Sequence, residues 1–214
     1  MRVLPILLLA SALAGAPVML PAQSAQSASA SLSTAADKGR ILGSDKATIW
    51  MLIVSDYQCP FCRDWHDKTW AAIRNEYVTT GKIRVAYVHF PLGQHPNARP
   101  TAIAAMCASV QGKFWPMTEL LFKTQDRWKD LKDSRPFVDS LVRVAGLDAA
   151  RHKRCMEAPA IAALVEADRV RMGRAGTEST PTFFIGAKRL AGALPIEEFR
   201  RAIDGELAAA KKRH

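Results

Sequence analysis

The chain has 214 residues, with 30 Lys and Arg against 20 Asp and Glu, which gives a formal net charge of +10. A basic balance is common in nucleic-acid-binding proteins, but here the basic residues are spread along the chain with no recognition motif and no aromatic residues between them. We therefore expect a basic solvated surface and no nucleic-acid partner. The length suits one well-cored domain, or one domain with an insertion.

The N-terminal segment has the parts of a secretory signal peptide. Arg2 precedes an apolar run, Val3 to Leu20, which is followed by small residues that suit cleavage. We predict a signal peptide over residues 1–22 and export to the periplasm. The alternative is an uncleaved membrane anchor, because the run approaches the roughly 18 residues that span a bilayer. Residues 23–45 are rich in Ala and Ser without an apolar period, and are expected to form a flexible leader.

A Cys-Pro-Phe-Cys motif, residues 59–62, follows an apolar and β-branched run at residues 48–54 that predicts a central strand. Pro60 suits the first position of a helix, which places Cys59 at the N-cap. The free N–H groups of the first turn and the helix dipole then favour the Cys59 thiolate. Thiols in such motifs have pKa values of about 3.5 to 7. The spacing predicts a disulfide that opens and closes, with Cys62 deeper in the turn as the resolving thiol.

The rest of the chain alternates between strand and helix patterns. The helix carrying the motif is expected to continue towards Gly81, and a strand is expected over residues 82–90. From Pro96 the pattern is helical for about 75 residues. Strand patterns return at residues 182–185 and 189–191, and an amphipathic helix follows Pro195. The predicted order is strand, motif helix, strand, helical insert, strand hairpin and helix.

The remaining two cysteines, Cys107 and Cys155, lie in the helical insert. An oxidising compartment favours pairing, and since Cys59 and Cys62 pair with each other, we predict a structural disulfide between Cys107 and Cys155. One alternative is two buried free thiols. Another is zinc held by all four cysteines, but structural zinc is usually bound by two close pairs, so we expect no metal.

Four motifs in order resemble the DsbA-like thiol:disulfide oxidoreductases. They are Ser-Asp-Tyr-Gln-Cys-Pro-Phe-Cys at 55–62, Phe-Pro-Leu at 90–92 with His-Pro-Asn-Ala at 95–98, Gln-Gly-Lys-Phe-Trp at 111–115, and Gly176 followed by Thr-Pro-Thr-Phe-Phe at 180–184. The resemblance covers about residues 39–207. It implies an α/β thioredoxin fold, a central mixed sheet flanked by helices, with an inserted all-helical domain. The thioredoxin domain would comprise residues 46–95 and 174–214, and the insert residues 96–173.

The resemblance also implies roles for individual residues. Cys59 would be the exposed attacking cysteine, Cys62 the resolving one, and Pro181 a cis proline facing both. The backbone of Thr180 would bind an extended substrate segment as an added strand.

Further implications concern the residues around the motif. Pro60 and Phe61, between the cysteines, would contact substrate and tune the redox poise. Asp56 is the nearest acid before the motif and a candidate proton relay, with a turn or hydrogen-bonding role as the alternative. His66 is expected on the helix surface, and His95 is expected to brace the start of the insert.

The predicted activity is dithiol–disulfide exchange on exported proteins, most simply as an oxidase, with the intrinsic disulfide in place of any cofactor. Expected partners are unfolded or partly folded exported proteins that contain cysteines and, by the resemblance, a membrane DsbB-like redox protein. The chain itself is expected to be a monomer. Two alternatives stay open. One is an isomerase or reductase of the same fold, because Thr180 is often found in the isomerase branch. The other is a redox-silent peptide-binding or chaperone module.

Overall fold

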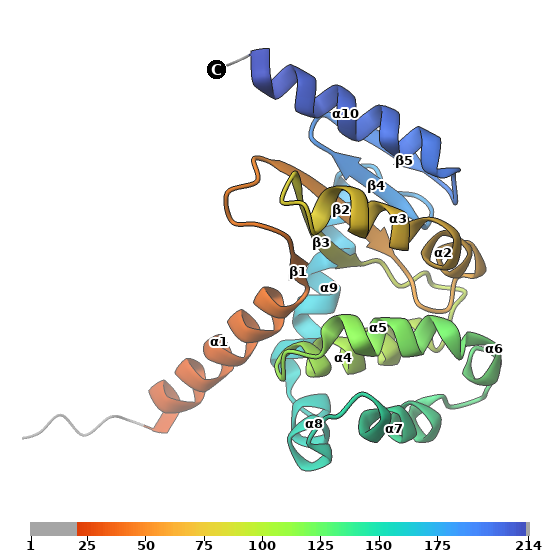
Figure 1. Cartoon of the computed structure of the whole chain (residues 1–214). Helices are drawn as coiled ribbons and strands as arrows, with labels where there is room; N and C mark the ends of the chain where they lie inside the picture. Colours follow the sequence, from red (N-terminus) through yellow and green to blue (C-terminus); the bar gives the residue numbers. More distant parts are fainter. Residues whose placement is uncertain (1–20, 213–214) are drawn as a thin grey trace, which may run out of the picture.

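The computed structural model describes residues 21–212. Within them the chain forms a mixed five-stranded sheet with helices on both faces, and a further group of helices packs below this unit (Figure 1). The predicted α/β class with a helical insert is confirmed. The predicted signal peptide, residues 1–22, lies outside the described residues except for its last two positions.

The sheet has the strand order β1-β3-β2-β4-β5. Its strands are β1 (Ile41–Leu42), β2 (Ile49–Ser55), β3 (Ile83–His89), β4 (Thr182–Ile185) and β5 (Lys188–Ala191). β2 and β3 are parallel, whereas the other neighbouring pairs are antiparallel. The apolar run before the motif is therefore the central strand β2, with Met51, Ile53 and Val54 fully buried. The motif consequently leaves the sheet from its centre.

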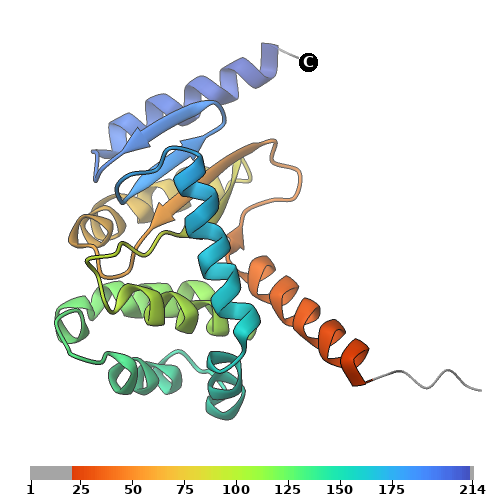
Figure 2. The ribbon, with the colours of Figure 1, turned by 180° about the vertical axis from the view of Figure 1, so that it is seen from behind.

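Helices cover both faces of the sheet. The helix that carries the motif runs without interruption through α2 (Pro60–Trp65), η1 (His66–Trp70), α3 (Ala71–Ile73) and η2 (Arg74–Val78), and the two η segments are π-helical. It shares one face of the sheet with α10 (Ile196–Lys212). Figure 2 shows α9 (Pro159–Arg174) crossing the opposite face. No helix within residues 21–212 is long and apolar enough to cross a membrane.

The insert contains five helices besides α9. They are α4 (Ala98–Ser109), α5 (Phe114–Lys123), α6 (Gln125–Trp128), α7 (Arg135–Val144) and α8 (Ala149–Met156). Ser134 is the N-cap of α7, with a proline in its first turn, and the Asp148 side chain caps α8 by accepting from the Arg151 N–H at 2.7 Å. The short α6 has no apolar period of its own and was not predicted.

A disulfide joins two of these helices. Cys107 on α4 and Cys155 on α8 are bonded across a sequence separation of 48, with both residues buried. Closing a loop of that length lowers the entropy of the unfolded chain enough to stabilise the fold by about 4 kcal/mol. The bond also uses two of the four thiols that the zinc alternative requires, and no cluster of metal-ligating side chains is found in residues 21–212.

The expected flexible leader at residues 23–45 is wrong. Residues 21–39 form α1 (Pro21–Gly39), and 41–42 form the edge strand β1. The Ala-rich sequence of α1 lacks a strong apolar period, but Ala is the best helix former, and tertiary contacts supply the remaining stability of the helix. Ala36 is fully buried, and its carbonyl accepts from Ser109 Oγ at 2.5 Å. A Cβ at Gly39 would lie 2.6 Å from the Ser109 carbonyl oxygen, so glycine permits this close approach to α4.

Candidate active site

The Cys59-Pro60-Phe61-Cys62 motif lies where the chain leaves β2 and begins α2. Cys59 has extended backbone angles (φ −70°, ψ 124°) and is the N-cap, while Pro60 is the first residue of the helix. The Cys59 carbonyl accepts the first helical hydrogen bond from Arg63 N at 3.3 Å. The predicted helix start is confirmed, and the N–H groups of the first turn therefore point towards the Cys59 sulfur.

The Thr180–Pro181 segment lies beside the motif because β4 is antiparallel to β2. Val54, near the end of β2, is paired with Thr182 at the beginning of β4. The Thr180–Pro181 peptide bond is cis. Cys59 Sγ lies 3.4 Å from the Thr180 carbonyl oxygen, to which Cys59 donates a hydrogen bond when it is protonated. Positions 121 residues apart in the chain thus meet at the reactive sulfur.

Both cysteines are free thiols and both are buried. Cys59 is 3% exposed and Cys62 fully buried, so the expectation of an exposed Cys59 is wrong. Figure 1 places the helical insert against the end of the sheet where the motif lies, and the Gln125 side chain of the insert donates to the Cys59 carbonyl. Phe61, between the cysteines, is by contrast 62% exposed and offers an apolar surface next to the site.

The two thiols have different acidities. The hydrogen bond from Cys62 lowers the pKa of Cys59 to about 6, with further contributions from the Thr180 side chain and from the backbone N–H groups of Cys62 and Phe61, against the opposing effect of burial. Burial raises the pKa of Cys62, and the negative charge on Cys59 adds to the effect. At neutral pH the pair therefore holds one thiolate, on Cys59, and one thiol, on Cys62.

This difference predicts a pH titration that assigns the thiolate. Alkylation of the reduced protein by a neutral reagent should be half-maximal near pH 6, the pKa of Cys59, because only the thiolate reacts. Because the pKa of Cys59 is lower in the folded protein than in the unfolded chain, the thiolate stabilises the reduced fold. This stabilisation is fully present when the pH is above the ordinary pKa of a thiol, and it is lost as the pH falls through about 6. Mass analysis of the alkylated protein should find the label on Cys59. A midpoint near 8.5, the value for a free cysteine, would contradict the assignment.

Asp56 is buried just before the motif and is fully engaged in hydrogen bonds. Its Oδ1 accepts from Gln58 N at 2.7 Å, and its Oδ2 accepts from Leu92 N at 2.9 Å and lies 2.7 Å from His95 Nδ1. Burial raises the pKa of Asp56, partly offset by these bonds. Asp56 and His95 thus join the motif loop to the start of the insert, as expected of His95. The proton relay through Asp56 stays a prediction.

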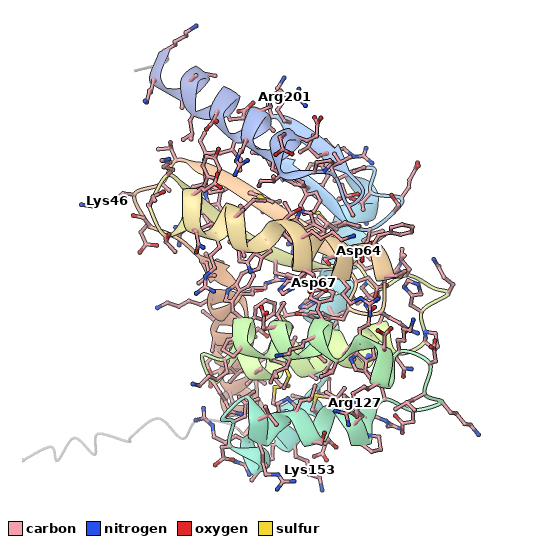
Figure 3. The ribbon with its side chains drawn as sticks, turned by 45° about the vertical axis from the view of Figure 1, so that its right-hand side comes forward. Lys46, Asp64, Asp67, Arg127, Lys153 and Arg201 are labelled. Carbon is pink, nitrogen blue, oxygen red and sulfur yellow. A yellow bond between two sulfur atoms is a disulfide. The ribbon has the colours of Figure 1, made fainter. Side chains whose placement is uncertain are left out.

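His66 is buried, so its expected surface position is wrong. Its ring packs against Phe122 with 4.8 Å between ring centroids, because the insert covers this side of the motif helix. His66 Nε2 lies 3.4 Å from Glu119, and Nδ1 lies 3.5 Å from Asp67. Asp64 and Asp67, labelled in Figure 3, lie on this helix and line the cleft that separates it from α5. Burial lowers the pKa of His66.

Two buried side-chain amides near the motif, those of Gln58 and Gln125, make contacts that could not be predicted from the sequence. Gln58 Nε2 donates to the Lys129 carbonyl, and its Oε1 accepts from Asn97 N, both at 2.7 Å. Gln125, on α6, donates to the carbonyls of Tyr57 and Cys59 at 2.7 and 3.0 Å. Gln58 and Asn97 lie within the motifs at 55–62 and 95–98, but no pattern in the sequence indicates these contacts, because the partners lie up to 71 positions away.

Fold and site together define a thioredoxin-fold protein with a Cys-Pro-Phe-Cys motif, a facing cis proline and a helical insert. A family model described as thioredoxin matches residues 35–205. The chain belongs to this family, and within it has the DsbA-like architecture predicted from the motifs.

The relatives include proteins of different lengths. The chain is 28% identical over 178 residues to the Na⁺/H⁺ antiporter NhaA 3 of Salinispora tropica. The aligned region covers 83% of this chain but 26% of the antiporter, so the chain spans about a quarter of the antiporter's length. A Bacillus anthracis protein named "probable disulfide bond formation protein D" is 22% identical, covering 78% of this chain and 77% of that protein. The crystal structure of Wolbachia pipientis alpha-DsbA1 is 22% identical, covers 81% of this chain and 93% of that one, and has a TM-score of 0.72.

Proposed function

We propose that the chain is a protein-disulfide oxidoreductase that acts as an oxidase on exported proteins. The observation that carries the proposal is the pairing of a low-pKa Cys59 at a helix N-cap with a buried Cys62, 3.4 Å from the carbonyl of the residue before a cis proline. A redox-silent binding module has no need of a stabilised thiolate. The name of the Bacillus anthracis relative supports disulfide chemistry.

In the proposed reaction a substrate thiolate attacks the Cys59 sulfur of the oxidised pair. The Cys59–Cys62 bond breaks, a mixed disulfide forms, and the electron pair passes to Cys62, which takes up a proton. A second substrate thiolate then attacks the substrate sulfur of the mixed disulfide and releases Cys59. The substrate loses two electrons and two protons; the pair gains both electrons and one proton, on Cys62, while the other proton passes to solvent because Cys59 leaves as a thiolate. Because Cys59 has the low pKa, it is the better leaving group, which favours release of an oxidised substrate.

The substrate segment would lie along Thr180 and Pro181, next to the exposed Phe61 ring. An extended chain there can hydrogen-bond to backbone groups as an added strand and bring its cysteine to Cys59. Pro60 and Phe61 would form the motif side of this contact. The substrates would be unfolded or partly folded exported proteins with cysteines, acted on in the periplasm after removal of the predicted signal peptide.

Turnover requires that the reduced pair be reoxidised. A membrane DsbB-like protein is the proposed electron acceptor, and the protein would act as a monomer without a bound cofactor. An isomerase or reductase is the second candidate, because Thr180 precedes the cis proline. The direction depends on the reduction potential of the Cys59–Cys62 pair.

Equilibration with glutathione, followed by separate assays of dithiol-peptide oxidation and of scrambled-disulfide rearrangement, tests the proposal. An oxidase should have a potential well above the about −270 mV of thioredoxin and should oxidise the peptide faster than it rearranges disulfides. Cys59→Ala should abolish both activities. A potential near or below that of thioredoxin would overturn the oxidase assignment in favour of a reductase, and exchange by Cys59→Ala would overturn the site.

A further inference from the structure

The side chain of Gln125 links the helical insert directly to the turn that carries the motif. Its Nε2 donates to two carbonyl oxygens, that of Tyr57 at 2.7 Å and that of Cys59 at 3.0 Å. These two carbonyls lie on either side of Gln58, so one amide group holds both ends of this turn. Gln125 is fully buried, so water does not compete for either bond.

The orientation of this amide is fixed by its partners. Both neighbours of Nε2 are carbonyl oxygens, which only accept hydrogen bonds, so the reverse orientation would place Oε1 against two acceptors. In the orientation seen, Oε1 is buried and has no hydrogen-bond partner among residues 21–212. An unsatisfied buried acceptor is unfavourable. The amide is therefore placed for its two donor bonds and not for the satisfaction of its own oxygen.

The support behind Gln125 is rigid. It begins α6, a single turn that ends at Trp128, and Trp128 is fully buried with its Nε1 donating to the Leu121 carbonyl at 3.0 Å. The Gln125 carbonyl in turn accepts from Lys129 N at 2.9 Å. The Gln125 amide that contacts the motif thus lies on a packed helical turn. Helices and strands position a site more accurately than loops do.

A reciprocal set of bonds runs from the motif to the insert. Gln58 donates to the Lys129 carbonyl and accepts from Asn97 N. Asn97 Nδ2 donates to the Leu131 carbonyl at 2.7 Å, and Asn97 Oδ1 accepts from Ser134 N at 3.1 Å. Gln125 alone among these amides contacts the backbone of a motif cysteine. The insert therefore contacts the Cys59 backbone through Gln125, whereas the bonds of Gln58 and Asn97 hold the neighbouring loop.

We propose that Gln125 is a positioning residue of the redox site, through which the helical insert holds the Cys59 turn in its N-cap geometry beside Pro181. Its relevance to turnover rests on the proposed oxidoreductase function. Without the amide, the Cys59 carbonyl keeps only its helical bond from Arg63. The turn then has more freedom, and the N–H groups of Phe61 and Cys62 point less well at the Cys59 sulfur.

The test is Gln125→Met, which keeps the length and volume of the side chain but removes both donors. The pKa of Cys59, read from thiolate absorbance in the reduced protein, should rise by about one unit, the effect of weakening one hydrogen bond to an anion. The glutathione equilibrium, measured at pH 8, should shift by about tenfold towards the disulfide, because the reduced state loses thiolate stabilisation. Gln125→Asn, whose shorter amide does not reach both carbonyls, should shift both quantities in the same direction and is available should Gln125→Met fail to fold.

Gln111→Met is the matched control. Gln111 also links two parts of the insert with its amide, accepting from Asp148 N at 2.9 Å and donating to the Asp148 carbonyl at 3.2 Å, but it does not contact the motif. It should leave the pKa of Cys59 and the glutathione equilibrium unchanged. An unchanged Cys59 pKa in folded Gln125→Met or Gln125→Asn would overturn the proposal, as would an equal shift in Gln111→Met. Because the thiolate titration needs no substrate, it separates this proposal from the proposed function, which fails instead when the wild-type protein shows no exchange.

Discussion

Cys62→Ala should convert the protein into a trap that retains its substrate through Cys59. Cys59 keeps a thiolate at neutral pH and still attacks a disulfide, but the thiol that would resolve the mixed disulfide is absent. In the wild-type protein Cys62 is an intramolecular thiol next to that bond, and such groups have high effective concentrations. The lifetime of the mixed disulfide should therefore increase on the order of 10³-fold.

The measurement is non-reducing electrophoresis followed by mass analysis of the adduct, with a disulfide-containing peptide as substrate. Cys59→Ala is the matched control and should form no adduct, because Cys62 is fully buried and its pKa is raised. Cys107 and Cys155 are already bonded to each other and should carry no substrate. An adduct on Cys62 in the Cys59→Ala variant, as abundant as the adduct on Cys59 in Cys62→Ala, would contradict the roles assigned to the two cysteines.

The part of the site that depends on local sequence could be predicted. Pro60 and the two-residue spacing determine the helix start, and a helix start orients N–H groups towards Cys59 wherever the helix lies in the fold. The strands and the helical insert could be predicted from hydrophobic periodicity, and the predicted elements differ from the observed ones mainly at their ends. The burial of Cys59 and His66 was missed because it depends on long-range contacts, those of Cys59 with Thr180 and of His66 with Phe122, and no local pattern encodes them.

The same reason explains the two other failures. Residues 21–39 have no apolar stripe that marks them as helix, and they are ordered by contacts with α4 and α9. Gln125 is an ordinary polar residue in the sequence, and only the fold shows that its amide meets the Cys59 carbonyl. Resemblance to a family transferred roles to the motif residues, but it did not supply these long-range polar partners.

The long-range partner with the largest expected effect on stability is Asp168. It lies on α9, is 1% exposed, and accepts hydrogen bonds from both terminal nitrogens of Arg40 and, at 3.1 Å, from His89 N. Arg40 also donates to the Tyr87 carbonyl at 3.1 Å and pairs with Asp37 at 2.5 Å. One carboxylate thus connects the segment after α1 to β3 and α9.

Asp168→Ala should lower the free energy of unfolding by about 3–5 kcal/mol, measured by urea denaturation of the oxidised protein. The loss is large because the Arg40 guanidinium, 9% exposed in its side chain, would be left buried with Asp37 as its remaining acidic partner, and the His89 N–H would lose its acceptor. Glu166→Ala is the control on the same helix. Glu166 pairs with Arg169 at the surface, where screening makes such pairs weak, so its removal should change stability little.

Limited proteolysis shows whether the lost stability falls on α1. If Arg40 holds α1 through Asp168, cleavage within residues 26–39 should become faster in Asp168→Ala than in Glu166→Ala, under conditions in which the sheet resists the protease. The double variant Arg40→Met with Asp168→Leu removes the unpaired charge and should be destabilised by less than the sum of the single changes. Additive losses, or a loss below about 1 kcal/mol in Asp168→Ala, would show that α1 is held instead by its packing on α4, where Ala36 and Gly39 meet Ser109.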